Sequence, residues 1–397
     1  MVQISDCVMR LAESATFAMM QKSNELSAQG VNVINMSVGE PDFNTPDHVK
    51  RAAIEAVEQN YSKYSPVPGY IWLRKSCSDK LKRENNLDYK PSQIIISTGA
   101  KQSLCNAVMA IVNPGDEVLL PSPCWVSYPE MVNLAGGVPV FVKAGIEQDF
   151  KATAAQIEKA ITPRTKAIMI CSPSNPTGSV YTKEELESIA EMLAKHPQIF
   201  IISDEIYEHI NFVGSHYSLA QFPGMKDRIA VINGVSKAYA MTGWRIGFMA
   251  GPEWLVSACN KLQGQYTSGT CSVAQKAAQA AFDGPQDDVE KMRQIFQRRR
   301  DLIVSLAKEI PGLEVNNPQG AFYLFPKCDS YFGKRYGEKV IKDSDDMAMY
   351  LLEVGHVATV GGTSFDAPEC IRFSYATGEE NIIEAFSRVK EALSALD

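Results

Sequence analysis

One lysine stands out among the residues whose types and spacing could do chemistry. Lys237 lies in a loop of small residues, and Arg245 follows it eight positions later. The apolar residues 229–232 before this loop indicate a short buried strand, and open α/β sheets bind their ligands at the carboxyl ends of such strands. An isolated loop lysine is more often a solvated surface charge. Lys237 is therefore a candidate only if other residues of the chain suit the same ligand.

A cofactor with an aldehyde, a phosphate and a pyridine ring would need a lysine to hold the aldehyde as a Schiff base, an acid against the ring nitrogen, donors for the phosphate and a flat surface for the ring. Asp204 suits the ring nitrogen because it follows the apolar residues 200–203, at a strand end where an unpaired carboxylate would be costly. Tyr207 could hydrogen-bond the ring hydroxyl. The alternative is that Asp204 and Glu205 cap the start of a helix.

The phosphate has candidate donors in two places. Gly99, Ala100 and Lys101 lie between an expected strand and an expected helix, where small residues let backbone N–H groups and the helix dipole meet a phosphate. Such turns are common, so this motif alone is weak evidence. Ser236 and Arg245 add a hydroxyl and a planar guanidinium that can bond two phosphate oxygens together.

Three further residues could complete the site. Trp125 could stack on the ring, although a buried tryptophan more often belongs to a core. Asn175 lies between prolines after the expected strand at 167–171, which aims its side chain at the same sheet edge, and the alternative is an ordinary turn asparagine. Arg372 lies within the expected strand at 370–375, where a substrate carboxylate or a structural salt bridge would have to pair with its guanidinium.

The elements that must position these residues follow an α/β pattern. From residue 93 onward, short apolar runs alternate with helical stretches, as in a mostly parallel sheet covered by helices on both faces. We expect one mixed sheet of seven strands, at residues 94–97, 117–120, 138–142, 167–171, 199–203, 229–232 and 246–250. Helices are indicated at residues 100–111 and 182–194, where Thr182 and Glu185 have the spacing of a capping box.

A chain of 397 residues suggests two domains. After Gly284-Pro285 the charged segment 287–308 indicates a helix with one exposed face. The rest resembles a small α+β domain, with strands at 321–326, 356–360 and 370–375 and helices at 345–354 and from 379. We predict a large cofactor-binding domain at residues 45–285, a small domain at 286–397, and an amino-terminal segment 1–44 that packs with the small domain and contains a helix at 15–29 and a strand at 33–37.

Composition and charge exclude several classes of function. Hydrophobic residues make up 45% and charged residues 21%, as in ordinary globular proteins, and no apolar run approaches the roughly 18 residues of a transmembrane helix. The start of the chain lacks the layout of a secretory signal, so we expect a cytoplasmic protein without membrane contacts. The net charge of −7 argues against nucleic acid as a partner. The nine cysteines and five histidines lack the spacing of a metal site or a disulfide framework.

Several motifs occur together and in a fixed order. They are Gly39-Glu-Pro-Asp-Phe-Asn-Thr-Pro46, Tyr64 before Pro66-Val-Pro-Gly69, Trp125, Asn175-Pro-Thr-Gly178, Ser203-Asp-Glu-Ile-Tyr207, Ser236-Lys237, Gly243-Trp-Arg245 and Arg372-Phe-Ser-Tyr375. This set resembles the aspartate aminotransferase family of fold-type I pyridoxal-phosphate enzymes, over essentially the whole chain. The likeness is strongest to the bacterial branch that includes prephenate-accepting enzymes.

The resemblance implies a role for each candidate. Lys237 forms the Schiff base with pyridoxal 5'-phosphate and then shuttles a proton between the substrate Cα and the cofactor. The other implied roles are Asp204 for the ring nitrogen, Asn175 and Tyr207 for the ring hydroxyl, Trp125 for stacking, and Gly39 with Arg372 for the substrate α-carboxylate, beside Trp125 and Asn175. Tyr64 resembles a tyrosine that reaches the phosphate of a neighbouring subunit, which implies a homodimer with shared active sites.

Substrate choice depends on fewer residues. Lys101, Ser14 and Thr16 match residues that this branch uses near a distal carboxylate, which favours aspartate or glutamate. Gly234 departs from the pattern, since many relatives have a phosphate-binding serine three residues before the lysine. Ala12-Glu13 stands where prephenate-accepting relatives often carry a basic residue, which argues against prephenate as a substrate.

We therefore expect transfer of the amino group of aspartate to 2-oxoglutarate in two half-reactions, with the cofactor storing the amino group between them. The alternatives on the same scaffold are a prephenate, aromatic or alanine aminotransferase and a carbon–sulfur β-lyase. A non-catalytic effector domain of a transcription regulator would need a DNA-binding segment, and residues 1–44 are too short and not basic enough to supply one.

Overall fold

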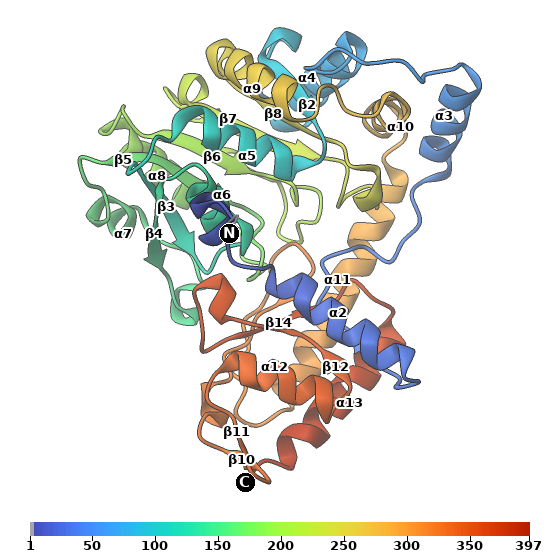
Figure 1. Ribbon diagram of the computed structural model, residues 1–397, viewed down its shortest axis with the longest axis vertical. Helices are drawn as coiled ribbons and strands as arrows, with labels where there is room; N and C mark the ends of the chain where they lie inside the picture. Colours follow the sequence, from blue (N-terminus) through green and yellow to red (C-terminus); the bar gives the residue numbers. More distant parts are fainter. Residues whose placement is uncertain (1–3) are drawn as a thin grey trace.

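The computed structural model describes residues 4–397 and is built around a large sheet with helices on both faces (Figure 1). Its strands, in spatial order, are β2 (Ile94–Ser97), β8 (Gly247–Ala250), β7 (Ile229–Gly234), β6 (Phe200–Asp204), β5 (Thr165–Cys171), β3 (Glu117–Ser122) and β4 (Val138–Lys143). Six strands run in one direction, and β8 is antiparallel to both of its neighbours. The expected α/β fold with seven strands is confirmed.

The strands are mainly apolar because most of the sheet is buried on both faces, and only the edge strand β4 is largely open to solvent among the seven. In β2, Ile94 and Ile96 pack into one core and Ile95 into the other, as the two-residue period of a strand requires. Helices that contribute to the first core are α3 (Asp47–Glu58), α4 (Ile71–Asn85), α7 (Ala154–Lys159), α8 (Lys183–Ala194) and α10 (Ser272–Asp283). Helices that contribute to the second are α5 (Ala100–Ile111), α6 (Ser127–Leu134) and α9 (Glu253–Tyr266).

The expected element bounds agree with the structure to within about two residues. Strands β3 and β7 each extend two residues beyond the expected end, and β8 begins one residue later than expected. The capping box of α8 is formed, since Thr182 Oγ1 accepts from Glu185 N and Glu185 Oε2 accepts from Thr182 N at 2.8 Å. These bonds satisfy N–H groups that have no partner within the helix.

Helix α11 (Asp287–Lys308) occupies the segment that its charge pattern predicted. It has 22 residues, and its first turn carries Asp287, Asp288 and Glu290, which complement the positive end of the helix dipole. Phe296 and Arg299 lie on its buried face. Among residues 4–397, no helix combines the length and apolar character needed to cross a bilayer.

A second group of elements lies beyond α11 (Figure 1). It comprises α2 (Ala15–Ala28), β1 (Ile34–Asn35), β9 (Tyr323–Leu324), β10 (Arg335–Tyr336), β11 (Lys339–Val340), α12 (Ser344–Glu353), β12 (Val357–Ala358), β13 (Val360–Gly361), β14 (Ile371–Ser374) and α13 (Glu379–Ser394). Helix α1 (Asp6–Met9) lies apart from this group and packs against α6, where Cys7 Sγ donates to Leu134 O at 3.6 Å. The expected single strand at 356–360 is wrong, because it is two short strands in different sheets: β12 pairs with β1, and β13 with β14. The expected strands at 33–37 and 321–326 shorten to two residues each.

A separate apolar core holds most of this second group together. Met19 and Met36 from the amino-terminal segment are buried in it. Ile206 and Tyr207, which directly follow β6 of the large sheet, also belong to this core. The carboxyl edge of the large sheet therefore packs against the second group. The domain limits at residues 44/45 and 285/286 stay a prediction.

Candidate active site

A cavity of about 570 Å³ opens where the carboxyl ends of the strands meet the second group of elements. Parallel strands end at one edge of a sheet, so the residues that follow them converge there. The expected residues that line the cavity are Ser14, Thr16, Gly39, Ala100, Lys101, Trp125, Asn175, Asp204, Tyr207, Lys237, Arg245 and Arg372. Residues distant in the sequence are thus brought together around one space.

Lys237 reaches the cavity from the loop after β7. Its Nζ donates to the carbonyl oxygen of Gly39 at 2.7 Å. Burial lowers the pKa of Lys237 to about 8, with Arg245 and Arg372 acting in the same direction and Glu40 opposing them. A substantial fraction of this amine is therefore neutral near pH 7 to 8, as a nucleophile requires.

Asp204 is the last residue of β6 and is buried at the floor of the cavity. Its Oδ2 accepts from the Tyr128 hydroxyl at 2.7 Å and its Oδ1 from the backbone N of Ile206 at 3.3 Å. Burial raises the pKa of Asp204 to about 6, although the Tyr128 hydrogen bond favours the charged form. No lysine, arginine or histidine within the described residues pairs with this carboxylate, so the site suits a cationic group of a ligand.

Arg372 in β14 is 2% exposed and has no carboxylate partner in residues 4–397. Its Nη1 donates to Asn175 Oδ1 at 2.8 Å and its Nη2 to Ser37 O at 2.6 Å. The guanidinium lies 4.6 Å from the ring centre of Tyr323, and its Nε is buried without a hydrogen-bond partner. Burial lowers the pKa of Arg372. The alternative of a structural salt bridge does not hold, and a buried cation at a cavity wall suits a carboxylate ligand.

The opposite end of the cavity suits a phosphate. Helix α5 begins at Ala100, and the N–H groups of its first turn lack partners within the helix. Gly99 has φ +80°, and a Cβ there would overlap Nη2 of Arg245. Glycine therefore lets the Arg245 guanidinium approach the start of the helix. Gly99 supports this corner without lining the cavity, and Ser236, which is buried, does not line it either.

Lys101 and Trp125 form the wall next to this corner. The Lys101 Nζ lies 4.8 Å from the centre of the Trp125 ring. Partial burial and the nearby Arg245 lower the pKa of Lys101. Ser14 and Thr16, at the start of α2, line the same cavity. These four residues thus line the same cavity as Arg372.

Tyr64 is the expected site residue that lies elsewhere. It is 98% exposed and borders a separate hollow with Lys63, Ser65 and Thr270. Within one chain it does not reach the cavity.

Several cavity residues were not predicted from the sequence. Tyr128, which supports Asp204, lies three residues after Trp125, and the two rings pack edge to face at 5.5 Å. An aromatic pair at this spacing on a helix start was the available signal. Tyr323 donates to or accepts from Tyr207 through their hydroxyls at 2.8 Å. The others are Phe17, Val38, Glu40, Leu104, Ser127, Cys171, Ile206, Thr242 and Gly243.

The comparisons with known proteins agree with this geometry. Residues 31–389 match the family model described as aminotransferase class I and II. The chain belongs to this family. It is 47% identical, over 100% of both chains, to the probable aspartate/prephenate aminotransferase of Rhizobium leguminosarum bv. phaseoli and to the aspartate/prephenate aminotransferase of Cereibacter sphaeroides.

Solved structures of aspartate aminotransferases have the same fold. That from Rhizobium meliloti has a TM-score of 0.96 at 41% identity, covering 100% of both chains. That from Thermus thermophilus with maleate has a TM-score of 0.93 at 40% identity, covering 99% of this chain and 100% of its own. As a class I and II aminotransferase, the protein uses pyridoxal phosphate as its cofactor.

The cavity fits this cofactor. Lys237 would hold its aldehyde and the unpaired carboxylate of Asp204 its ring nitrogen. The α5 start with Arg245 would hold its phosphate, and Trp125 offers a flat surface for the ring. Asn175 and Tyr207 line the space between these groups.

Proposed function

We propose that the protein transfers the amino group of aspartate to 2-oxoglutarate, giving oxaloacetate and glutamate. The observation that carries this proposal is a pair of cationic groups in one cavity: the buried Arg372 without a carboxylate partner, and Lys101 beside Trp125. Two such groups suit a dicarboxylic substrate. The solved structure of the Thermus thermophilus relative with maleate, a dicarboxylate, supports the same choice.

Each residue has a role in this proposal. When bound, pyridoxal phosphate supplies an electrophilic carbon and an electron-withdrawing ring that stabilises the charge left when the Cα–H bond breaks. Lys237 would take the proton from the substrate Cα and give it up again later in the half-reaction, since its lowered pKa leaves part of the amine neutral. Asp204 would hold the ring nitrogen in its protonated form, and Arg372 would orient the substrate α-carboxylate.

Lys101 decides the preference for a second carboxylate, with Ser14 and Thr16 as hydrogen-bond donors beside it. Aspartate and glutamate should therefore react faster than alanine or phenylalanine. The test is to mix the enzyme that carries its cofactor with a panel of amino acids and follow the absorbance of the cofactor, which isolates one half-reaction. Release of sulfide and pyruvate from cysteine would instead indicate a β-lyase. A protein that stays colourless with pyridoxal phosphate would indicate a non-catalytic module.

The variant Lys101→Ala sharpens this test. It should lower kcat/KM for aspartate by roughly 10–100-fold, the equivalent of one charge-assisted hydrogen bond, and change alanine turnover little. Alanine serves as the control within the same preparation. Equal losses for both amino acids would refute the assignment of Lys101.

Prephenate is the second candidate acceptor, because the names of both relatives above include it. This chain has Ala12 where a basic residue is expected in prephenate-accepting relatives, and the Ala12 backbone N donates to Glu130 Oε2 at 3.0 Å. We propose that prephenate is a poorer acceptor than 2-oxoglutarate. A competition between the two oxo acids for the aminated enzyme tests this order.

We propose further that the chain forms a homodimer in the cytoplasm, in which Tyr64 reaches the cofactor phosphate of the partner copy. The support is the 98% exposure of this large side chain, beside a hollow of about 610 Å³. Light scattering should give twice the mass of one chain, and Tyr64→Phe should weaken pyridoxal phosphate binding without changing that mass. A monomer with full affinity for the cofactor would refute the proposal, and cell fractionation tests the location.

A further inference from the structure

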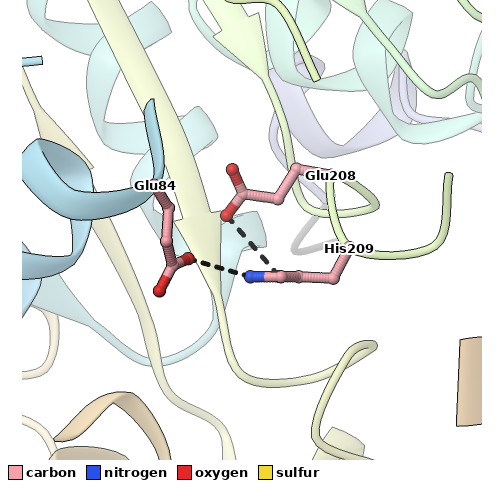
Figure 2. A group of neighbouring side chains, drawn as sticks. All are labelled: Glu84, Glu208 and His209. Atoms are coloured by element: carbon pink, nitrogen blue, oxygen red, sulfur yellow. Dashed lines mark hydrogen bonds and ion pairs between the residues drawn. The ribbon is translucent and has the colours of Figure 1, made fainter. Parts of the chain in front are cut away.

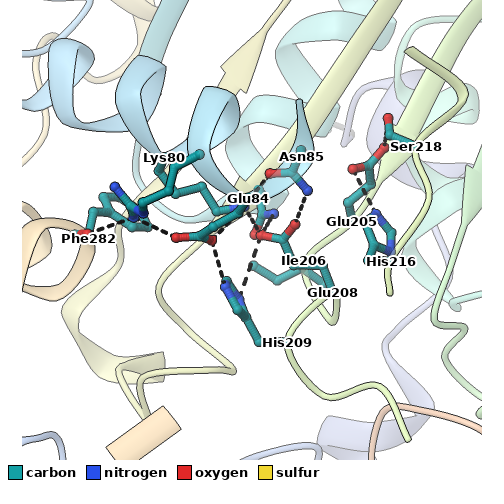
Figure 3. Close-up of polar contacts among 12 residues, drawn as sticks. Lys80, Glu84, Asn85, Glu205, Ile206, Glu208, His209, His216, Ser218 and Phe282 are labelled. Carbon is teal, nitrogen blue, oxygen red and sulfur yellow. Dashed lines mark hydrogen bonds and ion pairs between the residues drawn. The ribbon is translucent and has the colours of Figure 1, made fainter. Parts of the chain in front are cut away.

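A buried network of charges lies behind the cofactor-binding end of β6, on the side away from the active-site cavity (Figure 3). Glu208 is its centre, and its side chain is 3% exposed. Its Oε1 accepts from Lys80 on α4 and from Asn233 Nδ2 on β7, the latter at 2.7 Å. Its Oε2 accepts from Asn85 Nδ2 at 2.6 Å. Both oxygens of Glu208 are thus satisfied by donors from two other elements.

A lysine already supplies a positive charge to this network. Glu84, Glu208 and His209 lie close enough together to resemble a metal site (Figure 2). The Lys80 ammonium, however, contacts Glu208 and lies 3.4 Å from Glu84 Oε2, so it already supplies the positive charge. Burial opposes ionisation of Glu208, but the charge of Lys80, followed by those of His209 and His216, outweighs this effect. Together they hold the pKa of Glu208 well below its usual range. Glu208 is a buried carboxylate held in its charged form.

Residues 204–208, at the end of β6 and just after it, divide between the two sides. Asp204, Ile206 and Tyr207 line the active-site cavity. Glu205 and Glu208 point to the other side, where Glu205 accepts from Ser203 and Ser218 and pairs with His216 at 3.0 Å (Figure 3). A shift of Glu208 would therefore move Tyr207, its neighbour in the chain.

Glu208 is also tied to the strand that leads to Lys237. Asn233, its partner, is the penultimate residue of β7 and accepts from Gly234 N through Oδ1 at 2.7 Å. Lys237 follows four residues after Asn233. The Glu208 carboxylate thus connects three parts of the chain. They are its own segment, which contains Asp204 and Tyr207, strand β7, which leads to Lys237, and helix α4.

We propose that Glu208 is a positioning residue for the cofactor, which fixes the Asp204–Tyr207 segment relative to Lys237 without touching the cofactor itself. The proposal rests on the proposed function, because it assigns these three residues to pyridoxal phosphate. The side chains of Lys80 and Asn233 hold Glu208 in place from two directions. Loss of its charge leaves the buried Lys80 ammonium with only Glu84, 3.4 Å away, as a counter-charge, so the segment has to shift.

The test compares Glu208→Gln with Glu117→Gln. Glu117 also has little solvent exposure, begins β3 at the amino edge of the same sheet, and pairs with the largely exposed Arg164. Both variants should lower the stability of the cofactor-free protein towards urea. Only Glu208→Gln should raise the Kd for pyridoxal phosphate, by at least about tenfold or ~1.4 kcal/mol, and change the circular dichroism that the bound cofactor acquires. Its kcat for aspartate should fall more than its KM rises.

Asn233→Ala provides a second variant, because it removes the link between Glu208 and β7, together with the local bond from Gly234 N, and keeps the pair between Lys80 and Glu208. It should weaken cofactor binding in the same direction, to a smaller extent. In one outcome, Glu208→Gln loses stability like Glu117→Gln yet keeps the wild-type cofactor affinity and circular dichroism. That result would overturn the inference about Glu208 but leave the proposed function standing. If Glu208→Gln does not fold, wild-type binding by Asn233→Ala overturns it. A wild-type protein that does not bind pyridoxal phosphate would overturn the proposed function as well.

Discussion

The unpaired Asp204 should make the cofactor-free protein less stable at neutral pH than it would be with an uncharged side chain. Its carboxyl has a pKa of about 6 in the folded protein, against an ordinary value of 3.8. Because the pKa is higher in the folded than in the unfolded protein, protonation of Asp204 favours folding. This contribution to the free energy of unfolding is complete below about pH 3.8 and is lost as the pH rises through 6. The loss at pH 7 is about 3 kcal/mol.

The perturbation that tests this reasoning is Asp204→Asn, which removes the titrating group and keeps the shape of the side chain. One hydrogen bond, to Tyr128 or to Ile206 N, is weakened, at a cost of about 1 kcal/mol that does not depend on pH. Between pH 4.5 and 7.5, the stability of Asp204→Asn relative to wild type should rise by about 2 kcal/mol. At pH 7 the cofactor-free Asp204→Asn variant should be more stable than the cofactor-free wild type.

The assay is urea unfolding of the cofactor-free proteins at several pH values, followed by tryptophan fluorescence. Tyr128→Phe should steepen the pH dependence, because it removes the hydrogen bond that favours the charged carboxylate. In the background of Asp204→Asn, the same change should have no pH-dependent effect. A stability difference between Asp204→Asn and wild type that is constant with pH would refute the reasoning. With pyridoxal phosphate present the order should reverse, since the variant loses the partner of the ring nitrogen.

Three other predictions concern the cavity and its frame. Lys237→Ala should lower the rate of the aspartate half-reaction by at least about 10⁴-fold in single-turnover absorbance measurements, since it removes both the covalent attachment and the proton carrier; a loss of less than tenfold would contradict its role. Arg372→Lys should lower kcat/KM for aspartate by roughly 10–100-fold, because lysine cannot make the two-point contact of a guanidinium with a carboxylate. The effect should be much smaller for an amine without an α-carboxylate, and equal effects would contradict the proposed contact between Arg372 and the α-carboxylate. Gly234→Ser should lower the free energy of unfolding in urea by about 1–3 kcal/mol, because a Cβ there would lie 2.8 Å from Ile246 O. Unchanged stability would show that β7 and the neighbouring chain can accommodate the Cβ without a steric clash.

The large sheet could be predicted because most of its strands are buried on both faces. Most of them read as apolar runs of three to five residues, as residues 94–96 and 229–232 show, and turn residues separate the runs. Helix α4 was not predicted because its buried face carries Lys80, Ser76 and Asn85, which interrupt the apolar period. Their burial depends on partners far along the chain, such as Glu208, and no local pattern contains that information.

The small strands were harder to predict for a different reason. Residues 356–360 read as one strand-like stretch, yet β12 and β13 pair in two different sheets. A strand of two residues gains its stability almost entirely from its partners. Its bounds therefore depend on tertiary structure rather than on local propensity.

The individual site residues could be proposed from their positions after strands, but their mutual support could not. Asp204 was expected to pair with a cation of a ligand, whereas its hydrogen bond from Tyr128 appears only in three dimensions. The same holds for Arg372, whose contacts to Asn175 and Ser37 join three distant segments. The role of Tyr64 came from family resemblance alone and stays a prediction.

The arrangement of cavity residues and network residues along positions 204–208 limits how this site can evolve. Asp204 and Tyr207 serve the cavity, and Glu205 and Glu208 serve the network behind it, so the two sets interleave along one short stretch of chain. A substitution affects one of the two environments. Insertion or deletion of one residue would instead rotate the whole set, directing a network carboxylate into the cavity and the cofactor's partner into the buried ion pairs. The length of this stretch should therefore be far less free to vary than its composition.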